Sequence, residues 1–404
     1  MGTPADDPGF RAPDYADWDT APAQELWKAA RDEGGAVPAA PSAFDPRPAV
    51  VVTRFAAVDA VLRDAATFSS AIHKETSGRF KGETIVGMDG DEHRRHRAVV
   101  ASAFRPTSVE RWKTSAIEPV LHALLDEIAP LGRADLVETV TSRFPVQVIC
   151  TIIGLPREDH AQFLTWAEAI NMGPLDPEAG HAAADALTEY LRPIVAARRA
   201  EPTDDLLSAL VHAEVDGERL TEDRLFGFLR LLVPAGAETT SRALGSALAA
   251  LLAHPEALDG LRADPTRIPA YAEETLRWET PVAMVMRLAT ADTEIDGTPV
   301  AAGTSVTVLT SSANHDERRW TRPEVWDPDR PPAPHVAFGV GPHACLGTSL
   351  ARAELHLGIA AVLDRLPSLA ADPAAPPPEV AGYAFRGPRR LDAVWDPVPA
   401  SGSD

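Results

Sequence analysis

Residues 338–347 read FGVGPHACLG, and this stretch decides how the rest of the chain is interpreted. It contains Cys345, one of only two cysteines. The segment after it repeats apolar residues at helical spacing: Leu346, Leu350, Ala353 and Leu357. A thiol at the start of a helix lies near the positive end of the helix dipole, which stabilises the thiolate. Three glycines would let the backbone turn sharply and approach a flat ligand: Gly339, Gly341 and Gly347.

An isolated cysteine is more often a small buried apolar residue than a ligand. We keep that interpretation for Cys150, which lies inside the apolar run VQVICTIIGL. For Cys345, the glycine-rich loop leaves a second interpretation open, in which a rigidly held thiolate is the axial ligand of an iron porphyrin.

The composition is that of a globular protein, with 404 residues of which 45% are hydrophobic and 24% charged. No apolar run approaches the ~20 residues that span a bilayer, so we expect no membrane insertion. The N-terminus, MGTPADDPGFRAPDYADWDT, lacks the features of a secretory signal, and two cysteines are too few for a disulfide framework. We therefore expect a cytoplasmic protein. A formal net charge of -21 argues against nucleic acid as a partner.

We expect residues 1–404 to form one mainly α-helical unit with small β-sheets, in which residues 1–44 are a Pro-rich N-terminal arm. PAVVVTRF predicts a strand, AAVDAVLRDAATFSS a helix, and residues 70–92 a long irregular loop. Helical patterns dominate from residue 93, and strands are predicted in TEIDGTPVAAGTSVTVLT and twice in the tail PPPEVAGYAFRGPRRLDAVW.

Residues 221–253 predict one helix that begins at the N-cap residue Thr221. Pro234 and Gly236 lie in its middle, at costs of about 3 and about 1 kcal/mol relative to alanine. The sequence leaves two interpretations open: a single kinked helix, or two shorter helices with a loop between them.

The pattern of Phe338, Gly341, His343, Cys345 and Gly347 resembles the haem-binding signature of the cytochrome P450 superfamily, the haem-thiolate monooxygenases. The resemblance extends over residues 45 to 395 and implies the cytochrome P450 fold. A long kinked distal helix would lie over haem b, with the cysteine-ligand loop beneath it and Cys345 as the axial ligand of the haem iron.

Companion motifs of the same family follow in the expected order. Ala235 and Gly236 resemble the small residues that leave room for dioxygen over the haem. Glu238 and Thr239 match the acid and hydroxyl that supply protons for O–O cleavage, with Thr239 nearer the oxygen and Glu238 relaying protons from the surface. Thr240 is a weaker candidate.

Charged residues that would otherwise be interpreted as a solvated face match the family's haem-propionate ligands: His93, Arg97, Arg287 and His343. His335 lies near the same loop, and a structural role is favoured for it. Glu274 and Arg277 share one helix face, and in the family the matching pair joins a downstream arginine, here Arg330, in a structural lock.

The resemblance implies a monooxygenase that inserts one oxygen atom from O2 into a small or medium lipophilic substrate. Alternatives are a biosynthetic tailoring step such as oxidative coupling or nitration on the same scaffold, and a non-catalytic haem-thiolate sensor. We expect no fused reductase module, so NAD(P)H electrons would come through a separate ferredoxin and its reductase. We expect a monomer that docks ferredoxin on the cysteine side of the haem, through Arg94, Arg95, Arg105, Lys113 and Arg352.

The expected substrate pocket draws on several separate segments and is mostly apolar. It comprises Phe80, Met88, Met172, Leu231, Pro234, Ala235, Val282, Ala283, Met284, Val285 and Phe385. Arg230 is an unexpected charge in the apolar first half of the long helix, where it would either extend to solvent or contact a polar substrate group.

Overall fold

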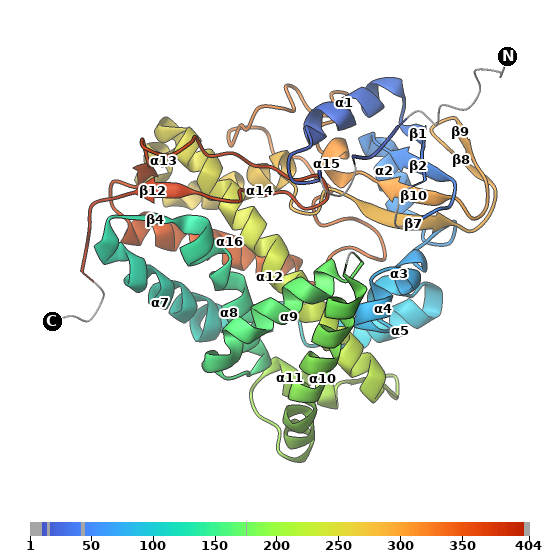
Figure 1. The fold of residues 1–404 in the computed structure, drawn as a ribbon, viewed down its shortest axis with the longest axis horizontal. Coiled ribbons are helices and arrows are strands. Elements are labelled where there is room, and N and C mark those ends of the chain that lie inside the picture. Colours follow the sequence, from blue (N-terminus) through green and yellow to red (C-terminus); the bar gives the residue numbers. More distant parts are fainter. Residues whose placement is uncertain (1–9, 14–16, 42–44, 175, 400–404) are drawn as a thin grey trace.

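The computed structural model describes residues 10–13, 17–41, 45–174 and 176–399, which fold into many helices and several small sheets (Figure 1). The helices are α1 Ala23–Glu33, α2 Phe55–Arg63, α3 Ile72–Glu75, α4 Gly78–Lys81, α5 Gly90–Ala101, α6 Pro106–Trp112, α7 Glu118–Ile128, α8 Arg143–Ile153, α9 His160–Met172, α10 Pro177–Ala200, α11 Leu206–His212, α12 Glu222–Ala253, α13 Pro255–Ala263, α14 Ile268–Trp278, α15 Thr310–Ala313 and α16 Thr348–Arg365. The strands are β1 Ala36–Ala39, β2 Ala49–Val52, β3 Phe68–Ser69, β4 Arg133–Asp135, β5 Glu214–Val215, β6 Glu218–Arg219, β7 Val285–Ala289, β8 Thr293–Ile295, β9 Thr298–Val300, β10 Ser305–Val308, β11 Ala370–Ala371 and β12 Asp392–Val394.

The largest sheet has five strands in the order β1-β2-β10-β7-β3 and lies beside α2 (Figure 1). β10 runs parallel to β2, and the other pairs in this sheet are antiparallel. β1 comes from the N-terminal arm, where Ala36 pairs with Val52 of β2. The hydrogen bonds of β1 therefore join the described part of the arm to the sheet.

α12 crosses the centre of the helical part and packs against α8, α9, α14 and α16 (Figure 1). Thr221 caps its N-terminus by accepting a hydrogen bond from the Arg224 N–H, and Pro234 lies inside it. Its second half is almost wholly apolar and buried, so packing against neighbouring helices stabilises it despite the proline. The alternative of two shorter helices is therefore wrong.

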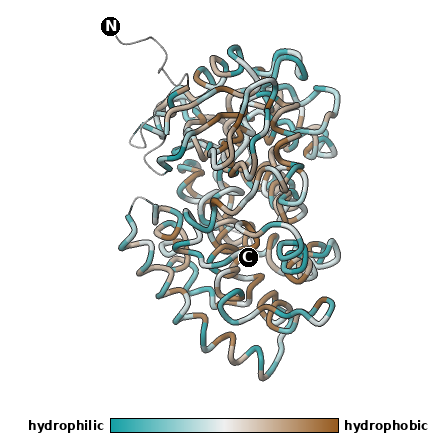
Figure 2. The backbone as a smooth tube through the Cα atoms, turned by 90° about the vertical axis from the view of Figure 1, so that its right-hand side faces the viewer, coloured by the Kyte–Doolittle hydropathy of each residue, from teal (hydrophilic) through white to brown (hydrophobic). Residues whose placement is uncertain are grey.

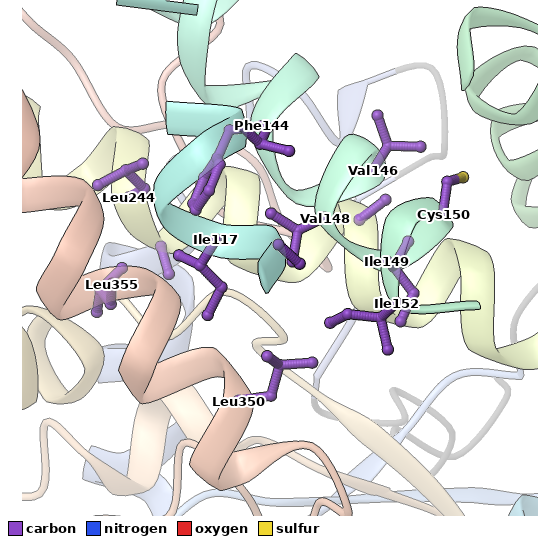
Figure 3. Close-up of a cluster of buried hydrophobic side chains, with 14 of the residues drawn as sticks. Ile117, Phe144, Val146, Val148, Ile149, Cys150, Ile152, Leu244, Leu350 and Leu355 are labelled. Atoms are coloured by element: carbon purple, nitrogen blue, oxygen red, sulfur yellow. The ribbon is translucent and has the colours of Figure 1, made fainter. Parts of the chain in front are cut away.

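The main hydrophobic core lies among α7, α8, α12 and α16. In Figure 3, side chains of these helices such as Phe144, Leu244 and Leu355 converge, and Cys150 belongs to the same buried cluster. Figure 2 shows hydrophobic segments running through the interior while hydrophilic segments lie mostly along the outside. None of the described helices is long and apolar enough to cross a membrane.

Two local expectations differ from the structure. Residues 70–92 are not one irregular loop, because α3, α4 and the start of α5 lie within them. These turns form where the side chains of Ile72 and Phe80 are buried, and tertiary packing outweighs the glycines between them. In the tail, β12 is a strand, but residues near Phe385 make only isolated bridges, Val282 to Phe385 and Ala381 to Gly387.

Candidate active site

The cysteine loop turns sharply before α16. Gly339 and Gly341 have φ angles of 64° and 76°, in the region that favours glycine. A Cβ on Gly341 would also lie 2.5 Å from the carbonyl oxygen of Leu62. Gly347 differs from our expectation, because its φ of -82° is open to any residue and a Cβ there would make only an ordinary contact with the Cys345 Sγ at 3.9 Å.

Hydrogen bonds within the loop fix Cys345. Its N–H donates to the carbonyl oxygen of Phe338 at 2.8 Å, and its own carbonyl accepts from the Thr348 hydroxyl at 2.8 Å. The cysteine remains accessible to solvent even though its neighbours are partly buried, so its sulfur is available to a ligand.

The pKa of the Cys345 thiol differs from the expectation based on the helix dipole. Burial raises this pKa above its ordinary value, while the Gly347 N–H, the Thr348 hydroxyl and the charge of Arg97 lower it by less. α16 begins three residues after the cysteine, which reduces any effect of its dipole. The loop thus presents a positioned thiol, and a metal ion bound to the sulfur would favour its thiolate form.

A cluster of two histidines and two arginines lies next to this loop. The rings of His93 and His343 have centroids 4.1 Å apart, and Arg97 of α5 donates to the Ala344 carbonyl at 2.6 Å. Arg287 of β7 is buried, and the charge of Arg287 lowers the pKa values of both histidines, after the larger effect of burial. The structure thus brings together the four residues that the sequence suggested as anion ligands.

Among the described residues, Asp89 is the carboxylate in contact with this cluster. Burial lowers the pKa of Arg287 to about 10, and Asp89 is the nearby carboxylate that partly offsets this by raising it. Asp89 also accepts from His343 at 3.3 Å. The Nε2 atom of His93 is buried without a hydrogen-bond partner among the described residues. Two carboxylates from a ligand would satisfy this nitrogen and balance the cations, so the residues fit a haem with its two propionates.

The accessible face of α12 contains the small and polar residues of the distal motif. Ala235 is exposed although its neighbours Pro234 and Ala237 are buried, so one stripe of this central helix is left open. The Thr239 hydroxyl, four residues further on, donates to the Ala235 carbonyl at 3.0 Å. Thr240 points elsewhere, since its buried hydroxyl donates to Glu354 of α16 at 3.4 Å.

Both carboxylate oxygens of Glu238 have partners. Oε1 accepts from Arg242 at 2.8 Å and Oε2 accepts from the side-chain amide of Asn171 at 2.9 Å. The Arg242 guanidinium also lies 5.8 Å from the ring of Phe385 in the tail. Glu238 therefore connects α12 with α9, and through Arg242 with the tail.

The lock that the sequence suggested is present. Arg277 donates to both oxygens of Glu274, at 2.8 and 2.7 Å, and Arg330 donates to Glu274 Oε1 at 3.2 Å. The pair is almost inaccessible to solvent, with exposed fractions of 2% and 6%. His335 contacts Glu273 at 3.2 Å, in agreement with a structural role.

The residues expected to line the pocket differ widely in burial. Phe80, Met88, Pro234 and Ala283 are buried, and Phe80 packs against the His181 ring at 4.7 Å. Met172 and Phe385 are exposed. Ala235 is also exposed. The remaining members are partly buried: Leu231, Val282, Met284 and Val285.

The basic residues expected to dock a partner protein mostly form ion pairs. Arg94 contacts Asp91, Arg95 contacts Glu218, and Lys113 contacts Glu110. Arg352 pairs with Glu273 at 2.6 Å. Arg105 is exposed at the N-cap of α6.

The structure gives Arg230 a role that differs from the two considered for it. Its Nε donates to the Lys81 carbonyl at 3.1 Å and its Nη1 donates to the Thr188 hydroxyl at 3.1 Å. Arg230 thus fastens α4 and α10 to α12.

Sequence reasoning missed several residues at this site: Lys81, Asp89, Asn171, Arg242 and Glu354. Lys81 and Asp89 lie in the region interpreted as a loop. Asn171 of α9 and Arg242, one turn after Glu238 in α12, were not predicted to contact Glu238. Glu354 is the exception, since a carboxylate on the buried face of a predicted amphipathic helix is a signal that the sequence contains.

Comparison with known proteins agrees with this geometry. Residues 38–381 match the family model described as Cytochrome P450. The chain is 36% identical over 326 residues to a steroid C26-monooxygenase of Mycobacterium tuberculosis, covering 79% of this chain and 87% of that protein. It is 38% identical over 332 residues to the erythromycin C-12 hydroxylase of Saccharopolyspora erythraea, covering 80% and 83% of the two chains.

A solved structure gives the same result for the fold. The cytochrome P450 PksS of the bacillaene polyketide synthase of Bacillus subtilis matches with a TM-score of 0.85 and 31% identity, covering 92% of this chain and 96% of that one. The mainly helical architecture with small sheets is thereby confirmed as the cytochrome P450 fold. The chain belongs to the cytochrome P450 family, oxidoreductases that carry haem b and use dioxygen with electrons from NAD(P)H supplied through redox partners.

Proposed function

We propose that this protein inserts one oxygen atom from dioxygen into a C–H bond of a small or medium lipophilic molecule. The observation that carries the proposal is the accessible thiol of Cys345 beside two arginines and two histidines, of which the buried His93 Nε2 has no hydrogen-bond partner among the described residues. When bound, haem would supply the activation of dioxygen, and the Cys345 sulfur would hold its iron. His93, Arg97, Arg287 and His343 would hold the propionates.

On the distal side, the residues of α12 would deliver protons. Thr239 lies on the accessible stripe with Ala235, where its hydroxyl would hold a water molecule and pass it a proton. Glu238 is one residue earlier and reaches toward Asn171 and Arg242, so it connects that stripe with more exposed groups. For transfer to occur, the carboxylate has to exchange one of these partners for water.

The names of the relatives support a lipophilic substrate. One acts on a steroid and another hydroxylates erythromycin. The partly buried apolar side chains of Leu231, Val282 and Val285 suit such a molecule. We place the protein in the cytoplasm, where a chain with two free cysteines is compatible with a reducing environment.

Electrons would come from a ferredoxin that docks beside the cysteine loop. α5 approaches this loop closely, because Arg97 contacts Ala344, and Arg94 and Arg95 lie exposed on the same helix. Ion pairs to Asp91 and Glu218 at exposed sites are weak, so an acidic partner can replace them.

The experiment that tests the function replaces Cys345 by Ser in the haem-loaded protein. The reduced wild-type protein under carbon monoxide is expected to show the absorption band distinctive of thiolate-bound haem, and Cys345→Ser is expected to lose it. Cys150→Ser is the matched control, since Cys150 is buried in the core, and it should keep the band. A band that survives in Cys345→Ser would overturn the proposal.

A further inference from the structure

Lys81 is a cation without a matching anion. It is the last residue of α4, and its ammonium donates one hydrogen bond, to the side-chain oxygen of Asn171 at 3.0 Å. Among the described residues, no carboxylate lies within ion-pair distance of Lys81. An ammonium has three N–H donors, so at least two lack a protein acceptor at hydrogen-bond distance.

The surroundings of Lys81 make this arrangement costly. Burial lowers its pKa to about 8, and the charge of Glu238 raises it by less. Glu238 is already engaged by Arg242 and Asn171, and Glu168 also interacts with Glu238, which raises the pKa of Glu168 after the larger effect of burial. The side chain of Lys81 keeps a partly accessible surface, so an anion from a ligand can reach the ammonium and offset the cost of its desolvation.

The backbone around Lys81 is held in place by α12. Arg230 donates to the Lys81 carbonyl, as described above, and Gly227 lets the segment come close. A Cβ on Gly227 would lie 3.1 Å from that carbonyl oxygen and 3.0 Å from the Glu83 carbonyl oxygen. Lys81 is therefore presented at a fixed position, as a recognition residue requires.

Lys81 also lies close to the distal face. The chain of contacts from Lys81 through Asn171 reaches Glu238, which is next to Thr239 on α12. Its sequence neighbour Phe80 is buried in the apolar core, so a cation and an apolar side chain come from adjacent residues of this segment. A lipophilic molecule with one anionic end matches both properties.

We propose that Lys81, with the Asn171 amide beside it, binds the carboxylate of a lipophilic carboxylic acid substrate. This inference rests on the function proposed above, because it assigns the substrate class of the same site. A carboxylate accepts charge-assisted hydrogen bonds from the free N–H groups of Lys81, whereas an alcohol or alkane end leaves the charge uncompensated.

The test uses the haem-loaded full chain and two series of probes of increasing chain length: ω-(imidazol-1-yl)alkanoic acids and the matching ω-(imidazol-1-yl)alkanols. The imidazole end binds the haem iron in both series, so the shift of the Soret band reports binding of each probe. At the best chain length, we expect the acid to bind about ten-fold more tightly than the alcohol, which corresponds to about 1.4 kcal/mol.

Lys81→Met is expected to abolish this preference, and Lys81→Arg to retain it. Lys74→Met, which removes an exposed lysine from the neighbouring α3, is the matched control and should leave the preference unchanged. Lys81→Gln serves as the second neutral variant should Lys81→Met not accumulate as folded protein.

Equal binding of acid and alcohol at every chain length in the wild-type protein would overturn the assignment. So would a preference that persists in Lys81→Met, since Lys81 would then be only a structural contact of Asn171. The carbon monoxide spectrum is recorded for each variant. A normal thiolate band without an acid preference refutes the role of Lys81 alone, whereas a missing band in the wild-type protein refutes the proposed function.

Discussion

At the scale of single residues, burial decides which polar groups are available for chemistry. Thr239 and Thr240 are adjacent in the sequence, yet one lies on the open stripe of α12 and the other donates to Glu354 in the core. Cys150 and Cys345 differ in the same way, because only Cys345 is accessible. From residue type alone, the two threonines could not be distinguished from each other, nor could the two cysteines.

Replacing Thr239 by Ala is expected to uncouple electron consumption from product formation. Without the hydroxyl, water and protons near the oxygen ligand are less ordered, and the yield of product per NAD(P)H should fall by about ten-fold or more, with hydrogen peroxide released instead. The ratio is measured with any substrate that shifts the Soret band. Thr240→Ala is the control and should remain coupled; full coupling in Thr239→Ala would contradict the proton-delivery role.

Glu354 predicts a dependence of stability on pH. Burial raises its pKa from the ordinary 4.5 to about 8, and the hydrogen bond from Thr240 opposes this by less. The unfolded chain then releases its proton at a lower pH than the folded chain, so this carboxyl destabilises the fold progressively as pH rises from 4.5 to about 8.

Glu354→Gln keeps a similar shape and removes this titration. We expect the difference in free energy of unfolding, variant minus wild type, to increase by ~1.4 kcal/mol per pH unit across that range. Urea unfolding at several pH values measures the difference. A difference that does not change with pH would show that Glu354 does not titrate in this way.

At the scale of elements, close packing sets which positions of a helix tolerate a side chain. α12 contains Gly236 and Gly245, which have different surroundings. A Cβ on Gly245 would lie 2.9 Å from the Cγ of Pro388, whereas a Cβ on Gly236 would lie 3.4 Å from the Cγ1 of Ile149. The tail thus rests directly on the second half of α12.

Gly245→Ala is expected to lower the free energy of unfolding by about 1–3 kcal/mol, because the tail has to shift. Gly236→Ala is the matched control in the same helix. The higher helix propensity of alanine should stabilise this variant by up to about 1 kcal/mol. The new Cβ would contact the Ile149 side chain, and a small shift of Ile149 relieves that contact. Denaturant unfolding compares the two variants, and an equal loss of stability in both would contradict this account of the packing.

At the scale of the whole molecule, charge determines how a partner approaches. The net charge of -21 repels an acidic ferredoxin at long range, so docking depends on a local basic surface. Arg94 and Arg95 are exposed on α5, whose Arg97 contacts the cysteine loop, while β4, which contains Arg133, lies on the opposite side of the molecule from α5 in Figure 1. All three arginines form ion pairs, with Asp91, Glu218 and Asp372.

Replacing both Arg94 and Arg95 by Glu is expected to slow reduction by ferredoxin about ten-fold at low salt and to weaken its dependence on ionic strength. Arg133→Glu reverses one charge on a different element, which is half the charge change of the double variant, and serves as the control. Stopped-flow measurements of haem reduction give both rates. Reduction that is unchanged in the double variant would move the docking surface elsewhere.

Much of the architecture and of the candidate site could be predicted from the sequence, because the signals are local. Helical periodicity and the cap at Thr221 predicted α12, and the pattern around Cys345 indicated the family and its cofactor. The short helices within residues 70–92 could not be predicted, since no sustained periodicity exists there and packing of Ile72 and Phe80 forms them.

The sequence by itself determined the family, the cysteine at the centre of the site and the long central helix, because each depends on residues close together in the chain. Only the tertiary structure decided the state of the thiol, the partners of Glu238 and Arg230, and the unpaired charge of Lys81. These depend on burial and on contacts between segments distant in sequence, where desolvation opposes local charge effects, and neither quantity is encoded in any short stretch of residues.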